Sequence, residues 1–176
     1  MTRHDRQTLH VLPRPGNPAQ GLLRLGSLRV RCALGRSGVT HWKREGDGGT
    51  PAGRYALVEV RYRPDKIARP RTLLPLRRTR RQDGWCDGKG DRNYNRPVPL
   101  PYPASAETMW RDDDVYDVVV VLDWNLRPRR QNGGSAIFFH LARPGYRPTE
   151  GCVAVNRADM LKILRRLRPG AAFKVR

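Results

Sequence analysis

The sequence has little cysteine and no long apolar run. Its three cysteines, Cys32, Cys86 and Cys152, are odd in number and show no Cys-x-x-Cys spacing, which argues against a disulfide framework and a zinc knuckle. No segment reaches the length of a membrane span, and residues 1–21 lack the apolar core of a signal peptide. We therefore expect no membrane span and, in the chain as encoded, no export signal.

Acidic residues are also scarce. There are 16 of them against 35 basic residues, mostly arginine, and the formal net charge is +19. Such a field attracts polyanions, including nucleic acid, anionic lipid or an acidic wall polymer. The arginines are nevertheless spread along the chain, and the densest stretch, residues 69–81, is interrupted by prolines and leucines. Two interpretations stay open, a solvated basic surface and functional attraction of a polyanion.

The apolar residues that are present fall into strand-like runs. Residues 22–34 alternate between apolar and basic, which predicts a hairpin that turns at Gly26-Ser27 and places Cys32 in the core. The same reasoning predicts strands at 54–62, 115–124, 135–142, 153–155 and 171–176. A length of 176 residues is enough to bury a core without a metal or a disulfide.

One helix is expected, over residues 157–167, with Asn156 as its N-cap. Residues 35–53 are too rich in glycine for regular structure, and residues 63–109 have many prolines and little periodicity, as in a long functional or disordered loop. We predict a mostly β fold, a β-sandwich or open barrel with one or two helices. Residues 1–21 would form an N-terminal segment leading into the first strands, and residues 22–176 a single domain.

A histidine and a cysteine stand close in the chain. His140 ends an apolar run, and Cys152 follows twelve positions later across a loop. An imidazole beside a thiol can take its proton, and the sulfur can then attack a carbonyl. Gly151 would let a substrate approach the backbone, where N–H groups of Gly151, Cys152 and Val153 could hold an oxyanion. The spacing alone also fits a buried, inert cysteine and a histidine that is only hydrogen bonded.

Three ordered elements together resemble a known family. They are Thr50-Pro51-Ala52-Gly53-Arg54-Tyr55, the run that ends at His140, and Thr149-Glu150-Gly151-Cys152-Val153. This combination is similar to the YkuD-type L,D-transpeptidase catalytic domain, and the resemblance runs from about residue 28 to residue 175.

The resemblance implies an acyltransferase that acts on peptidoglycan tetrapeptide stems without a cofactor or metal. Cys152 would attack the carbonyl next to a terminal D-amino acid and form a thioester, with His140 as base and then as acid. An amine of a second stem would then complete a cross-link. With water instead, the enzyme would be an L,D-carboxypeptidase or amide hydrolase.

The chain departs from the family pattern near Cys152. The family commonly has histidine where this chain has Glu150, often has arginine where this chain has Ala154, and usually has a longer interval between histidine and cysteine. A non-catalytic basic domain that binds wall polymer or nucleic acid is the second hypothesis. Because the implied substrate lies in the periplasm or cell envelope, the missing export signal leaves the location open. The sequence also leaves the oligomeric state open.

Further residues are candidates for binding the substrate. Thr50, Pro51 and Gly53 belong to an element that lies beside the site in the family, and Thr149 and Glu150 precede the Gly-Cys pair. The remaining candidate cleft walls are Tyr94, Asn95, Trp124, Arg143 and Tyr146. Lys43, Glu45 and Asp47 can hold a substrate or an ion, although their Gly-Asp-Gly context is more typical of a turn. We expect no specific nucleic acid as a partner.

Overall fold

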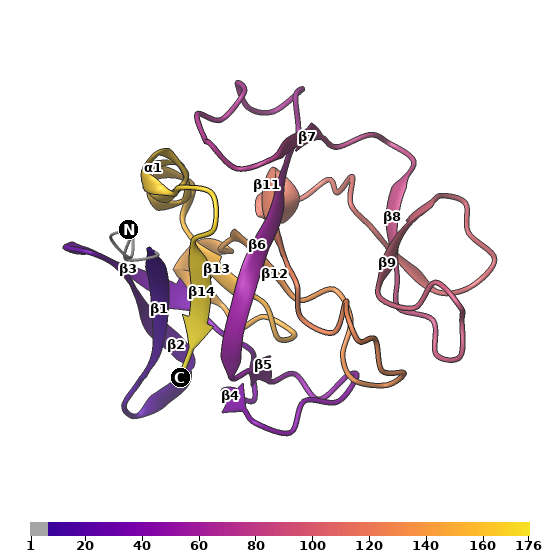
Figure 1. Ribbon diagram of the computed structural model, residues 1–176, viewed down its shortest axis with the longest axis horizontal. Helices are drawn as coiled ribbons and strands as arrows, with labels where there is room; N and C mark the ends of the chain where they lie inside the picture. Colours follow the sequence, from indigo (N-terminus) through magenta and orange to yellow (C-terminus); the bar gives the residue numbers. More distant parts are fainter. Residues whose placement is uncertain (1–6) are drawn as a thin grey trace, which may run out of the picture.

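The chain folds mostly into β-strands, as Figure 1 shows for the computed structural model, which describes residues 7–176. The strands are β1 (Thr8–Arg14), β2 (Asn17–Leu25), β3 (Leu28–Ala33), β4 (Val39–Thr40), β5 (Thr50–Pro51), β6 (Gly53–Tyr62), β7 (Leu76–Arg78), β8 (Asp83–Cys86), β9 (Arg96–Pro99), β10 (Ala106–Thr108), β11 (Val118–Leu122), β12 (Phe138–Leu141), β13 (Val153–Val155) and β14 (Ala172–Val175). The α-helix is α1 (Arg157–Arg166), and two 3-10 helices are η1 (Asp114–Tyr116) and η2 (Pro144–Tyr146). The predicted mostly β fold is confirmed.

The main sheet closes on itself. Its nine strands follow the order β11-β12-β13-β3-β2-β1-β14-β6-β7, and β11 also pairs with β6. This last pairing, which sets Val120 opposite Val60, joins eight strands into a barrel and leaves β7 outside the ring. Side chains alternate along each strand, so every strand of the ring has one row inside the barrel and one row outside.

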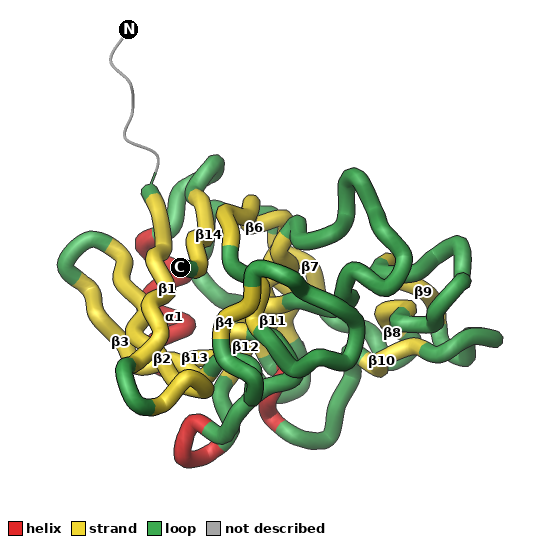
Figure 2. The backbone as a smooth tube through the Cα atoms, turned by 90° about the horizontal axis from the view of Figure 1, so that it is seen from below, coloured by secondary structure: helices red, strands yellow, loops and turns green. Residues whose placement is uncertain are grey.

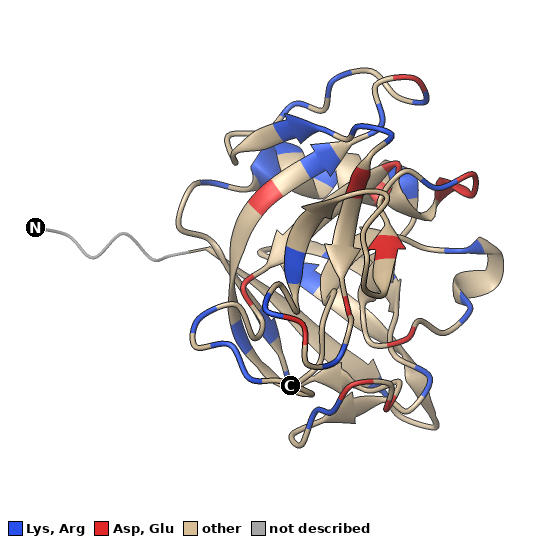
Figure 3. Cartoon of the chain, turned by 90° about the vertical axis from the view of Figure 1, so that its right-hand side faces the viewer, with Lys and Arg blue, Asp and Glu red and all other residues tan. Residues whose placement is uncertain are grey.

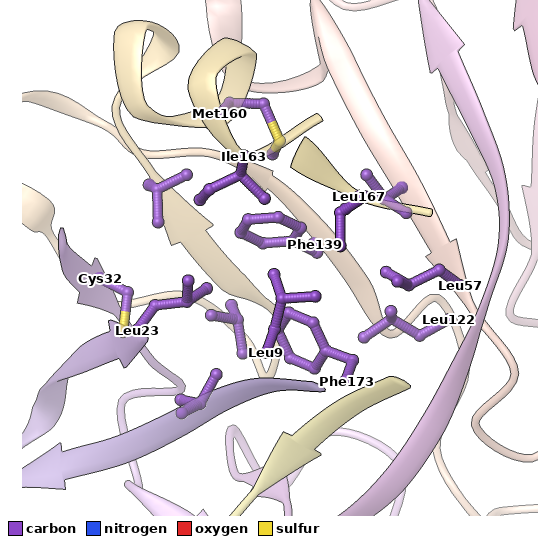
Figure 4. Close-up of a cluster of buried hydrophobic side chains, with 14 of the residues drawn as sticks. Leu9, Leu23, Cys32, Leu57, Leu122, Phe139, Met160, Ile163, Leu167 and Phe173 are labelled. Carbon is purple, nitrogen blue, oxygen red and sulfur yellow. The ribbon is translucent and has the colours of Figure 1, made fainter. Parts of the chain in front are cut away.

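The inward rows form the main core. Figure 4 shows Leu9, Phe139 and Phe173 from three separate strands together with Met160 and Ile163 of α1, and all five are fully buried. Burying one such side chain contributes roughly 1.5–3 kcal/mol, so this cluster is the main source of stability. Cys32 is also fully buried in it, as the alternation of residues 22–34 predicts.

The sheet begins earlier than the sequence pattern predicted. The hairpin turns at Gly26-Ser27 as expected, but β2 starts at Asn17, and β1 lies between β2 and β14 in the ring. The pattern was hidden because Pro13, Pro15 and Gly16 interrupt it. The proposed N-terminal segment 1–21 therefore contributes β1 and the first part of β2 to the barrel, while its residues 1–6 lie outside the described part.

Several predicted elements have corrected bounds. Of the strand expected at 115–124, only residues 118–122 are extended, and Asp114–Tyr116 forms η1. The strand expected at 135–142 is limited to Phe138–Leu141. The helix is confirmed over Arg157–Arg166, and its N-cap is Asn156, whose side chain accepts a hydrogen bond from the Asp159 N–H at 2.8 Å.

The long irregular loop expected at 63–109 is partly wrong. The segment contains β7 and a separate three-stranded sheet of order β10-β8-β9, which Figure 2 shows beside the barrel. These strands have only three or four residues, and β9 contains two prolines, so a period cannot appear in the sequence. Together with η1 the segment covers outward side chains of β11 and β12 in a second buried cluster, which contains Trp85, Met109, Tyr116 and Phe138.

A pair of leucine substitutions tests the place of the N-terminal strand. Leu9→Ala removes a fully buried side chain of β1 and should lower the free energy of unfolding by about 2–5 kcal/mol. Leu22→Ala, in β2, removes a side chain that is 39% exposed and should lower the free energy of unfolding much less. Urea denaturation measures both, and equal losses would contradict the integration of β1 into the core.

Candidate active site

The register of β12 and β13 brings His140 and Cys152 to one face. The two strands are parallel, and Phe139 pairs with Val153; both side chains point into the main core. Because side chains alternate, the flanking residues Phe138, His140 and Cys152 point outward. Phe138 and Cys152 accordingly belong to the second cluster. His140, in β12, and Cys152, directly before β13, thus lie on the same outer side of the barrel.

The turn before Cys152 is held by its own hydrogen bonds. The Thr149 hydroxyl donates to the Cys152 carbonyl at 2.6 Å and accepts from the Gly151 N–H at 3.2 Å. Gly151 has a φ of +134°, and a Cβ there would lie 2.8 Å from the Gly49 carbonyl oxygen. Only glycine fits this position without a shift. The Cys152 N–H takes part in none of the hydrogen bonds of residues 7–176, so it is open to a ligand.

Burial keeps the Cys152 thiol protonated. Its sulfur accepts a hydrogen bond from the Phe138 N–H at 3.3 Å and donates one to the Ala136 carbonyl at 3.2 Å. Burial raises the pKa of the Cys152 thiol to about 12, and the Phe138 N–H opposes this rise. At neutral pH the sulfur is therefore a thiol and needs a base in order to react.

His140 is suited to be that base. Its Nδ1 lies 2.9 Å from the Leu141 carbonyl oxygen, which can only accept, so Nδ1 carries the proton and Nε2 keeps its lone pair. The ring packs edge-on against Tyr116, with centroids 5.3 Å apart. Burial lowers the pKa of His140 to about 4. The imidazole is neutral at neutral pH, as a proton acceptor must be.

A cavity of about 430 Å³ opens beside both side chains. Its lining comes from the loop 43–49, from the segments that contain Asp87 and Glu107, from η1, and from the residues around β12 and β13. These residues are Glu45, Gly46, Asp87, Glu107, Arg111, Val115, Tyr116, Ser135, Ala136, His140, Arg143, Thr149, Glu150 and Cys152.

The cavity is lined with charges of both signs. The Tyr116 hydroxyl donates to Glu107 at 2.7 Å, and the Arg111 guanidinium lies over the Tyr116 ring at 5.2 Å. Burial raises the pKa of Glu107. Asp87 has a buried Oδ1 without a hydrogen-bond partner among the described residues. An unpaired buried carboxylate oxygen is costly to the fold.

A buried lysine lies directly beneath the turn. The Lys43 side chain is only 2% exposed and forms an ion pair with Asp47, which also accepts hydrogen bonds from the N–H groups of Arg44 and Gly49. A Cβ on Gly151 would lie 3.3 Å from Lys43 Nζ, so this charge lies beside the residue before Cys152. Through this ion pair the Gly-Asp-Gly turn holds Lys43 in place beside Gly151.

Four of the sequence-predicted substrate residues line the cavity. They are Glu45, Arg143, Thr149 and Glu150. Glu150 forms an exposed ion pair with Arg36 at 3.3 Å, and Arg143 lies 3.7 Å from Asp113. Both can therefore reach a bound peptide at the cavity rim.

The other predicted residues support the walls from behind. Asn95 binds Trp85 Nε1, the Ala136 N–H and the carbonyls of residues 124 and 125, and the Tyr94 hydroxyl donates to Glu45. The remaining five lie away from the lining. Thr50 accepts a hydrogen bond from the Gly35 N–H, the Pro51 carbonyl accepts one from the Tyr55 hydroxyl, and Gly53 packs on the Tyr55 ring. Trp124 donates to the Gly133 carbonyl, and the Tyr146 hydroxyl accepts from Asn156. Direct substrate contact by these seven residues stays a prediction.

Several lining residues were missed by sequence reasoning. Asp87, Glu107, Arg111 and Tyr116 lie in or next to the proline-rich stretch whose short strands gave no period. Ser135, which donates to Glu45 at 2.7 Å, precedes a strand and has no motif around it. Only the paired charges around Tyr116 could have drawn attention to this segment.

Other kinds of site are not evident in the described residues. Within residues 7–176 no group of three or more His, Cys, Asp or Glu side chains is arranged to hold a metal ion. In the same range no helix is both long and apolar enough to cross a membrane.

Fold and cavity together define a class, that of mostly β domains with a cysteine and a histidine beside one cavity on the outside of a barrel. The chain belongs to the YkuD family of L,D-transpeptidase catalytic domains, whose family model matches residues 6–175. This is a family of enzymes that act on peptidoglycan peptides. No curated protein and no solved structure matches the chain.

The buried neutral histidine predicts a specific pH dependence of stability. An unfolded imidazole titrates near 6.5 and the folded one near 4, so between these values only the unfolded state binds the proton. The free energy of unfolding should therefore fall as the pH drops through this window, by about 3 kcal/mol in total.

Urea denaturation at a series of pH values measures this dependence. The variant His140→Gln should lack that contribution, whereas His41→Gln, at an exposed position, should keep it. Identical pH dependences for the wild type and His140→Gln would contradict the assignment.

Proposed function

We propose that this protein is an L,D-transpeptidase that uses Cys152 as nucleophile and peptidoglycan tetrapeptide stems as acyl donors. The observation that carries the proposal is the placement of Cys152 and His140 on one face of β12 and β13, at the same cavity. Membership of the family supports the reaction class.

The first step converts the neutral pair into a reactive one. His140 Nε2 takes the proton of the Cys152 thiol while the sulfur attacks the carbonyl carbon of the residue before the terminal D-amino acid. For this the thiol leaves its hydrogen bond to the Ala136 carbonyl and turns toward the ring, since no hydrogen bond joins it to His140 at rest within the described chain. The imidazolium that forms is stabilised by the Leu141 carbonyl at Nδ1.

The negative charge that develops on the substrate oxygen needs a donor. The open Cys152 N–H supplies one. The Gly151 N–H is already used by Thr149, and Val153 lies in the strand ladder, so Cys152 is the best placed of the three predicted oxyanion residues. The positive charge of Lys43 beside Gly151 adds a favourable field at the same place.

Collapse of the tetrahedral species completes the first half of the reaction. The carbon–nitrogen bond breaks, His140 returns the proton to the leaving amine, and the acyl group remains as a thioester on Cys152. In the second half an amine of another stem attacks the thioester, His140 accepts its proton, and the thiol is regenerated. Water in place of the amine gives hydrolysis.

The charges of the cavity fit a peptide stem that carries both carboxylate and ammonium groups. Arg111 and Arg143 offer positive charge for the carboxylate of the terminal D-amino acid. Asp87, which also lines the cavity, offers negative charge for an ammonium group of the donor side chain or of the acceptor.

A defined stem peptide tests the activity directly. Incubation with a tetrapeptide stem should release the terminal D-amino acid and give a thioester adduct in the intact mass of the protein. An added amine acceptor should yield the cross-linked peptide. Cys152→Ala should abolish both the release and the adduct because it removes the attacking sulfur.

Cys32→Ala is the matched control, since this cysteine is fully buried in the main core and should leave both readouts intact. D-Amino acid release that persists in Cys152→Ala would overturn the mechanism. A strict transpeptidase should stop releasing the D-amino acid when no acceptor is added, whereas an L,D-carboxypeptidase should continue.

Asp87→Asn tests the recognition of the ammonium group. The substitution keeps the shape and removes the charge, so KM for the amine-bearing peptide should rise by about tenfold or more, with a small change in kcat. The same peptide with its side-chain amine acetylated should bind wild type and variant equally. An equal loss for both peptides would assign Asp87 a purely structural role.

A further inference from the structure

A row of four cationic side chains and one histidine runs across five neighbouring strands of the barrel. In the register of β3, β2 and β1, Arg29 pairs with Arg24, and Arg24 pairs with His10. In the register of β1, β14 and β6, His10 pairs with Lys174, and Lys174 pairs with Arg54. Neighbouring strands lie about 4.8 Å apart, so the row is roughly 19 Å long.

This row, which we call the cationic row, points to the outside of the barrel. Its three arginines are exposed, whereas the residues between them, such as Val11 and Leu23, are buried in the core. Arg31 and Arg176 lie two positions further along β3 and at the end of β14, on the same outer face. Like charges in direct cross-strand register destabilise a sheet, so folding alone does not account for the arrangement.

Carboxylates are absent from this part of the chain. No aspartate or glutamate occurs in residues 7–44 or 160–176. Among the described residues, none of the ion pairs involves Arg24, Arg29 or Lys174. Burial, followed by the charges of Arg176, Arg24, Lys174 and Arg54, lowers the pKa of His10, in agreement with an accumulation of positive charge. By contrast, the side that Figure 3 presents carries both signs.

Exposed aliphatic side chains accompany the charges. Leu22 of β2 is 39% exposed and Val58 of β6 is 41% exposed, and both point outward in the same alternation as Arg24 and Arg54. Leu73, which is 63% exposed, shares a cavity of about 730 Å³ with His10 and with arginines at the end of α1, namely Arg165, Arg166 and Arg168. Large exposed apolar residues beside unneutralised arginines are typical of surfaces that lie on membranes.

The position of this face relative to the site follows from the ring order. From β12 to β1 there are four steps through β13, β3 and β2, and four steps through β11, β6 and β14. The cationic row is centred on β1, and the cavity lies outside β12. The two faces are therefore on opposite sides of the eight-stranded ring.

We propose that the outer face of β3, β2, β1 and β14 docks on an anionic phospholipid bilayer. Arg29, Arg24 and Lys174 neutralise headgroup phosphates, and Leu22 enters the boundary between headgroups and acyl chains. The outward positions of these strands hold no Phe, Trp or Tyr, the side chains on which single-stranded nucleic acid stacks. The proposal concerns a second surface and does not depend on the reaction at Cys152.

Vesicle co-sedimentation tests the docking. The full chain should sediment with vesicles of phosphatidylcholine and phosphatidylglycerol but not with phosphatidylcholine alone, and rising salt should release it. The triple variant Arg24→Gln/Arg29→Gln/Lys174→Gln should bind the anionic vesicles on the order of a hundredfold more weakly, since each charge near the surface contributes several-fold. Leu22→Ser should weaken binding without changing the charge.

A matched triple variant separates location from net charge. Arg92→Gln/Arg96→Gln/Arg127→Gln removes three exposed charges on other parts of the surface and should keep near wild-type binding. The first triple variant should not have a lower thermal midpoint, because it relieves like-charge pairs, and this shows that it is folded. Equal loss in both triple variants, unchanged binding in the first, or binding to double-stranded DNA with none to anionic vesicles would each overturn the proposal.

Discussion

Pairing of β11 with β6 is the constraint on which the rest of the structure depends, because it closes the ring. Closure fixes which side of every strand is inside. Phe139 and Val153 then point into the core, and because side chains alternate, the residues next to them point outward. The parallel pairing of β12 with β13 then brings a cysteine and a histidine that are twelve positions apart in the chain to one outer face.

The second cluster turns an exposed strand face into a site. Trp85, Met109 and Tyr116 cover the outer side of β11 and β12 and exclude water from Cys152 and His140. Burial leaves the thiol and the imidazole neutral. In the proposed mechanism this weakens the resting nucleophile but places the later ion pair in a medium of low dielectric constant. Charge separation there is favourable only when a substrate and an oxyanion donor complete the arrangement.

The sequence predicted the parts of the molecule that repeat a period or a motif. The alternation of residues 22–34 and the apolar stripe of α1 gave correct elements, and the three family motifs agree with the family to which the chain belongs. The cavity walls could not be predicted. Glu107 stands in a strand of three residues, and Asp87 and Arg111 lie outside the strands, so no period indicates them and their meeting depends on tertiary packing. The row from Arg29 to Arg54 was also hidden, since its members are adjacent only through the register of five strands.

Burial of the Cys152 thiol also bears on the lifetime of the protein. Oxidants and electrophiles attack the thiolate far more readily than the thiol. A sulfur held protonated and hydrogen bonded to the Ala136 carbonyl is therefore oxidised or alkylated slowly. In the proposed mechanism the sulfur becomes reactive only when His140 takes its proton, so the burial that slows the resting residue also protects it from oxidation.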